Sequence, residues 1–98
     1  MEITKSEEKG EVKIAVRGCL DTAATPEFAA ALQDVRDDQA LLLDFSELEF
    51  IASSALRQLV SAKKKRGTAG GPIALVGLND VVADVFDVTG LNGVFEIR

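Results

Sequence analysis

The stretch LLLDFSELEFIASSALRQL, Leu41 to Leu59, changes from one repeating pattern to another along its length. It begins with three consecutive leucines, an apolar run without alternation that is typical of a strand covered on both faces, and so central and parallel in its sheet. From Ser53 onward the spacing is helical, because Leu56, Leu59 and Val60 fall on one face. The stretch therefore predicts a central strand that leads directly into a helix.

The residues before this stretch predict a hairpin and a first helix. Two extended runs surround the turn Glu8-Lys9-Gly10, and the second run alternates apolar and polar side chains over 12–17. A helix is expected over 25–38, with Thr25 as its cap and Pro26 at its first position. Its apolar stripe would consist of Phe28, Leu32 and Val35.

The residues after it predict two more strands and one more helix. A basic last turn is followed by Gly67, and the glycines at 67, 70 and 71 indicate a connection to the short apolar run IALVGL. Asn79 is placed to cap a helix that ends before Gly90, and GVFEIR would be a terminal strand. Strands and helices in this order predict a small sheet with helical crossovers.

Length and composition limit the function classes. The 98 residues are the size of one domain, so we expect a single domain over 1–98. The net charge of -5 opposes long-range attraction to nucleic acid, which is not expected as a partner. No apolar run is long enough for direct membrane insertion and the start lacks a secretory signal, so a cytoplasmic location is expected.

The residue types do not favour an enzyme. The chain contains no histidine, which excludes the common serine triad, and Lys63 lies about 15 Å along the helix from Ser53. The single cysteine, Cys19, excludes an internal disulfide or a cysteine metal cluster, and no ordered oxygen-ligand loop accompanies the carboxylates. We therefore expect no catalytic residue, no cofactor and no metal.

The basic run Lys63 to Arg66 has two interpretations. Cations at the end of a helix complement its dipole while they remain solvated. Four adjacent positive charges on an acidic chain could instead form a docking patch for an acidic partner.

Ser53 and Ser54 also have two interpretations. One of the two hydroxyls is expected to cap the helix that begins there, a contribution of about 1 kcal/mol. The same helix terminus also tolerates a phosphate, since its free N–H groups and positive dipole end favour added negative charge. A phosphorylated serine here would leave the fold intact and change the surface that a partner meets.

Three segments together resemble the STAS domain, typified by bacterial anti-sigma factor antagonists: RGCLDTAATPEF, LLLDFSELEFIASSALRQL and NDVVADVFDVTGLNGVFEI. The likeness covers nearly the whole chain. It implies an α/β fold, with a small mixed, partly parallel sheet of about five strands and helices packed mainly on one face.

The resemblance also implies a site. Ser53 matches the serine that a combined kinase and anti-sigma factor phosphorylates in that family, and Ser54 matches the serine beside it. Ala52 and Ala55 depart from the family, which usually has Asp and Gly there. The partner-binding residues that the resemblance implies are Gly18, Asp21, Thr25, Ser46, Ala52, Ser53, Ser54, Ala55 and Arg57.

The function implied is that of a regulatory module that binds an anti-sigma factor or serine kinase and is switched by phosphate on Ser53. The alternative is a STAS-like subunit that does not switch and belongs to a larger assembly, such as a lipid-transport ATPase or a signalling scaffold. The two altered residues of the motif favour this alternative.

Overall fold

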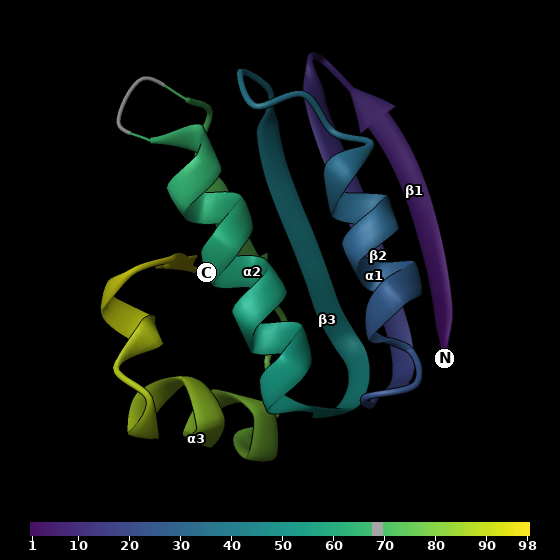
Figure 1. Ribbon diagram of the computed structural model, residues 1–98, viewed down its shortest axis with the longest axis vertical. Helices are drawn as coiled ribbons and strands as arrows, with labels where there is room; N and C mark the ends of the chain where they lie inside the picture. Colours follow the sequence, from purple (N-terminus) through teal and green to yellow (C-terminus); the bar gives the residue numbers. More distant parts are fainter. Residues whose placement is uncertain (68–69) are drawn as a thin grey trace.

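The computed structural model describes residues 1–67 and 70–98, which form one five-stranded sheet in the order β1-β2-β3-β4-β5 (Figure 1). β1 is antiparallel to β2, and every other neighbouring pair is parallel, so the expected α/β fold with a partly parallel sheet is confirmed. The elements are β1 (Glu2–Glu8), β2 (Glu11–Leu20), α1 (Thr25–Gln33), β3 (Ala40–Ile51), α2 (Ser53–Arg66), β4 (Ile73–Val76), α3 (Asp80–Val88), the 3-10 helix η1 (Leu91–Gly93) and β5 (Glu96–Ile97).

The hairpin turn lies where the sequence predicts it. Lys9 and Gly10 both have positive φ, 54° and 80°, as a two-residue hairpin turn of the primed type requires. The terminal strand, expected over 93–98, is shorter than predicted, because η1 precedes it and only Glu96–Ile97 pair with β4.

The strand β3 is central and parallel, as predicted, but the expectation that it is covered on both faces is wrong. Leu41, Leu43 and Phe45 point to the helix side and are fully buried. Leu42 points to the other face and is only half-buried, beside Lys13 in the neighbouring strand. Figure 1 shows α1 and α2 over the same face of the sheet, so the leucine run has a helix cover on one side.

The first helix begins differently from the prediction. Thr25 is not its cap: the N-cap position belongs to Ala24, whose side chain makes no capping bond. The carboxylate of Asp21 supplies the missing acceptor, because its Oδ1 accepts the Ala24 N–H at 2.9 Å. Thr25 is the first helical residue and is buried, which leaves its hydroxyl available for contacts inside the protein.

The third helix is capped as predicted and attached to the central strand. Asn79 Oδ1 accepts the Val82 N–H at 2.8 Å, and Asn79 Nδ2 donates to the Leu48 carbonyl at 2.8 Å. This side chain therefore fixes the start of α3 against β3, near the end of the sheet where β3 leads into α2 (Figure 1).

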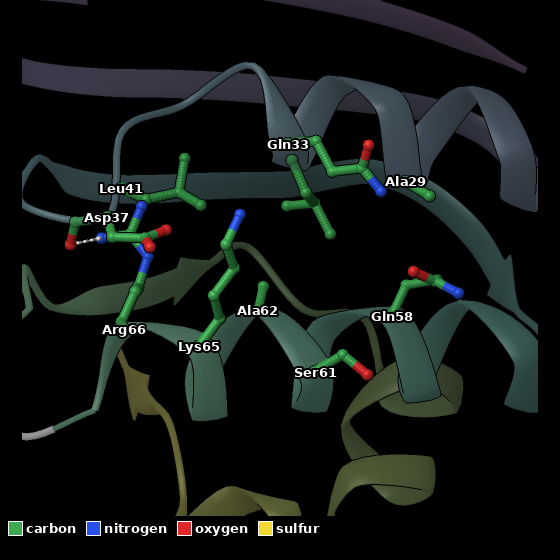
Figure 2. A pocket seen from close by; sticks show the side chains of 10 residues that line it. Ala29, Gln33, Asp37, Leu41, Gln58, Ser61, Ala62, Lys65 and Arg66 are labelled. Carbon is green, nitrogen blue, oxygen red and sulfur yellow. Dashed lines mark hydrogen bonds between the residues drawn. The ribbon is translucent and has the colours of Figure 1, made fainter.

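Arg66 fits neither interpretation of the basic run, because both assume a solvent-exposed cation. Its side chain is buried, and its guanidinium donates to the carbonyls of Arg36, Asp37, Gln39 and Gly71. Figure 2 shows it beside Asp37 at one end of a cavity of about 380 Å³ between α1 and α2. Burial lowers the pKa of the guanidinium from its ordinary value, and the carboxylates of Asp37 and Asp38 oppose that effect. Arg66 is therefore a structural connector, not part of a solvated patch.

The connection that the sequence predicts after α2 includes residues 68 and 69, which lie outside the described residues. Within 1–67 and 70–98, no helix is both long enough and apolar enough to cross a membrane.

Candidate functional site

The candidate site lies where β2 and β3 end and α2 begins. The Ala52 N–H donates to the Leu20 carbonyl at 2.8 Å, which holds the start of α2 against the end of β2. The turn from Asp21 to Thr25 follows Leu20 directly, so the first turn of α1 and the first turn of α2 are brought together. Two segments that are about 30 residues apart in the chain thus form one surface.

The prediction that Ser53 or Ser54 caps α2 is wrong. The N-cap position is Ala52, in extended conformation, and no side chain caps this helix. Both serines already lie inside the helix, where a side chain is past the position from which it can accept the first N–H groups. The carbonyl of Ala52 accepts the N–H groups of Ala55 and Leu56 at 3.1 Å each.

The hydroxyl of Ser54 is hydrogen-bonded to Thr25 at the start of α1. Ser54 Oγ lies 2.8 Å from Thr25 Oγ1, and Thr25 Oγ1 donates its single proton to the Asp21 carbonyl at 3.0 Å. Because a hydroxyl has one proton to give, the Ser54 hydroxyl must be the donor to Thr25. Ser54, Thr25 and Asp21 therefore form a short chain of hydrogen bonds that joins α2 to α1.

The hydroxyl of Ser53 differs from that of Ser54. Ser53 is exposed, and its side chain makes no hydrogen bond to any residue within 1–67 and 70–98. Of the two adjacent serines, Ser53 thus presents the accessible oxygen.

Gly18 and Asp21 both shape the chain that approaches the site. Gly18 has φ of +88°, a conformation that residues with a side chain rarely adopt, and a Cβ there would lie 3.5 Å from Met1 Cα. Asp21 uses its carboxylate for Ala24 and its carbonyl for the first turn of α1. Asp21 thereby fixes the turn that carries Thr25 to Ser54, and Asp21 itself is exposed.

Ser46 bonds to Asp44 and makes no hydrogen bond to the described residues around Ser53. Its N–H and its hydroxyl both donate to Asp44 Oδ1, at 2.9 and 2.6 Å. These two bonds lower the pKa of the Asp44 carboxyl, the hydroxyl contributing most, and Lys13 at 3.6 Å adds to the effect.

The bond from Ser46 to Asp44 predicts a pH-dependent stability. The lowered pKa of Asp44 stabilises the fold above the unfolded-state pKa of about 3.9, and this contribution is lost as pH falls through the folded-state pKa. Ser46→Ala should therefore lower the free energy of unfolding by about 1 kcal/mol at pH 7. The difference from the wild type should shrink below about pH 4 in urea titrations.

Ser6→Ala is the matched control for that measurement, since Ser6 is exposed on β1 and its hydroxyl makes no hydrogen bond to the described residues. If the loss of unfolding free energy in Ser46→Ala stays constant from pH 7 to pH 3, Asp44 is not the group responsible for it.

The remaining residues of the implied site differ in exposure. Ala55 is fully buried, so its methyl group packs in the core and is not presented to a partner. Ala52 is half-buried at the edge of the site. Arg57 is exposed one helical turn beyond Ser53, and its side chain makes no ion pair or hydrogen bond within the described part of the chain.

Phe50 is a surface residue that the sequence did not assign to the site. It is 46% exposed, whereas the adjacent Ile51 is buried, and it pairs in register with the exposed Cys19. The alternation of side chains along the end of β3 was the available signal, but two consecutive apolar residues concealed which one faces outward.

No group of three or more His, Cys, Asp or Glu side chains that could hold a metal ion occurs in the described ranges. The arrangement offers instead one accessible hydroxyl, an exposed aromatic ring and an exposed guanidinium around the start of a helix. An exposed ring and an exposed guanidinium are groups that can contribute to contacts with another molecule, and the accessible hydroxyl lies at a helix start that tolerates added negative charge.

Comparison with known sequences identifies similar proteins. The family described as "Mlab, STAS domain" matches residues 3–97. The anti-sigma-B factor antagonist of Listeria monocytogenes is 28% identical over 96 residues, which cover 96% of this chain and 84% of that protein.

Comparison with solved structures finds the same fold. An anti-sigma factor antagonist from Mycobacterium paratuberculosis is 25% identical with a TM-score of 0.89, over 99% of this chain and 84% of that one. The Bacillus cell fate determinant SpoIIAA in its phosphorylated form is 18% identical with a TM-score of 0.73, over 99% of this chain and 91% of that one.

Proposed function

This chain belongs to the STAS domain family, and from that membership we propose that it acts in the bacterial cytoplasm as an anti-sigma factor antagonist. It binds an anti-sigma factor that is also a serine kinase and so releases the sigma factor, without catalysing a reaction itself. The relative from Listeria monocytogenes and the structure from Mycobacterium paratuberculosis, both named as such antagonists, support this proposal.

The difference between Ser53 and Ser54 carries the proposal. A kinase needs a hydroxyl that can enter its active site, and Ser53 is exposed with a hydroxyl that makes no hydrogen bond to the described residues. The Ser54 hydroxyl is bonded to Thr25, so its modification would break a hydrogen bond between α1 and α2. Phosphate on Ser53 is therefore compatible with an intact fold.

A phosphate on Ser53 would change the surface more than the fold. It adds a charge of roughly -1.5 to -2 at a helix N-terminus, where the dipole and unpaired N–H groups favour negative charge. An interface formed around the same helix start must desolvate that charge or meet it with repulsion. Phosphorylation would thereby release the partner.

Ser53→Asp is expected to weaken binding to the partner at least tenfold, about 1.4 kcal/mol, while circular dichroism stays near that of the wild type. Calorimetry against each purified anti-sigma factor encoded in the same genome measures the effect. Ser6→Asp adds the same charge on β1, away from the site, and should leave the affinity unchanged. Equal affinities of Ser53→Asp and the wild type would contradict the proposed switch.

A second candidate function is that of a permanent subunit of a larger assembly, such as a lipid-transport ATPase. The observation that favours it is Ala52, which leaves α2 without a side-chain cap at the position where antagonists usually carry Asp. A phosphorylation assay with the purified kinase separates the two functions. Antagonist function requires phosphate on the wild type and on Ser54→Ala but not on Ser53→Ala; no incorporation into the wild type or Ala52→Asp supports the permanent subunit.

A further inference from the structure

A groove of about 430 Å³ runs along α2 from Ser53 toward the end of the helix. One wall is a single stripe of α2 at helical spacing, and the other comes from Thr89 and Leu91, at and after the end of α3. The residues that line the groove are Ser53, Leu56, Arg57, Val60, Ser61 and Lys64 on α2, and Thr89 and Leu91 opposite them.

The groove combines an apolar centre with two cations, Arg57 and Lys64, that form no ion pair within 1–67 and 70–98. Leu56, Val60 and Leu91 supply the apolar surface between Arg57 and Lys64, and no carboxylate lines it among the described residues. Arg57 is the exception among the five arginines of the chain. Arg17, Arg36 and Arg98 pair with carboxylates, and Arg66 donates to backbone carbonyls.

Lys9, Lys63 and Lys65 also form no ion pair with the described residues, so what distinguishes Arg57 and Lys64 is their place beside an apolar surface that no described carboxylate lines. Arg57 and Lys64 are seven residues apart, about 10 Å along α2 and close to two full turns, so both point into the groove. The charge and shape of the groove are complementary to an acidic segment with an apolar face.

We propose that this groove binds an amphipathic, acidic helix of the partner and that Arg57 pairs with a carboxylate of that helix. A phosphate on Ser53 then binds Arg57 in place of the carboxylate. The inference rests on the proposed function for its partner and its phosphate. It goes beyond that function by naming the chemistry of the partner segment and the residue through which phosphorylation acts.

The competition follows from the spacing of Ser53 and Arg57. Residues four apart on a helix are neighbours, with Cβ atoms about 5 to 6 Å apart, so a phosphate on Ser53 comes within reach of the guanidinium. Arginine binds phosphate and carboxylate alike through two parallel N–H donors, but the phosphate carries a charge of roughly -1.5 to -2, and so attracts the guanidinium more strongly than a single carboxylate does. Lys64 lies eleven residues from Ser53, about 16 Å along α2, and cannot take part.

The capture of Arg57 is testable without any partner or kinase. Phosphoserine is incorporated at position 53 during synthesis of the full chain, and the phosphate is titrated by phosphorus NMR. We expect the midpoint of its second ionisation to rise by roughly 0.2 to 0.7 pH unit in Arg57→Gln and to stay unchanged in Lys64→Gln. Equal midpoints in the wild type and Arg57→Gln would overturn the capture, whether or not the chain is an antagonist.

The groove itself is tested by affinity for the anti-sigma factor that binds the unmodified chain in calorimetry. Arg57→Gln and Lys64→Gln should each weaken binding, Arg57→Gln by tenfold or more. Lys65→Gln is the matched control, because Lys65 is an exposed cation on the other flank of α2, where it lines the cavity of Figure 2. Equal affinities of the three variants would overturn the groove as the binding surface while leaving the antagonist function standing.

A second copy of this chain is the other candidate occupant. Sedimentation from micromolar to millimolar concentration distinguishes it from a partner. A monomer throughout supports the proposal, and a dimer that Arg57→Gln disrupts would overturn it.

Discussion

Arg66→Ala is expected to lower the free energy of unfolding by about 3 kcal/mol and the melting temperature by roughly 12 to 24 °C. The side chain is buried and donates to four carbonyls, which lie between α1 and β3 and in the connection before β4. Removing it leaves partly buried carbonyls without their donor and a void at the end of α2. Thermal unfolding followed by circular dichroism measures the loss.

Two variants separate this role from charge alone. Lys65→Ala removes an adjacent, exposed cation and should change the free energy of unfolding by less than about 0.5 kcal/mol. Arg66→Lys retains the charge but cannot reach several carbonyls with a planar fork of donors, so we expect an intermediate loss. If Arg66→Ala and Lys65→Ala were equally stable, the buried contacts of Arg66 would not matter to the fold.

Gly77→Ala is expected to lower the free energy of unfolding by about 3 kcal/mol, an effect as large as that of Arg66→Ala. Gly77 has φ of +77°, and a Cβ there would lie 2.7 Å from both the Cα and the Cβ of Ser46. Left-handed backbone costs a residue with a side chain about 1 to 2 kcal/mol, and displacement of the adjacent strand adds to that. Denaturant unfolding compares the variant with the wild type.

Gly10→Ala is the matched control, because Gly10 has nearly the same φ, +80°, and a methyl group there would have no atom within 4 Å of it. The free energy of unfolding of Gly10→Ala should fall only by the cost of the left-handed backbone, about 1 kcal/mol. Similar losses in the two variants would mean that the contact of Gly77 with β3 contributes nothing. The contact also explains why Ser46 is fixed between Asp44 and Gly77, away from Ser53.

The order of the elements, the hairpin turn and the cap of α3 could all be predicted from the amino-acid sequence. Each of these depends on residues close together in the chain: positive φ at Lys9 and Gly10, or a side-chain oxygen of Asn79 three residues from its donor. Local backbone preferences are sufficient there, since no distant contact competes with them. The motif around Ser53 was likewise found from adjacent residues, because it is continuous in the chain.

The roles of individual side chains could not be predicted in this way, because they depend on the folded chain. Thr25 and Ser54 both look like caps in sequence, yet they bond to each other across 29 positions. Arg66 resembles its three lysine neighbours until the fold brings four carbonyls around it, and Arg57 becomes distinctive because the other arginines find partners. Hydrogen bonds and burial depend on which distant segments meet, and that meeting is set by the packing of the helices on one face of the sheet.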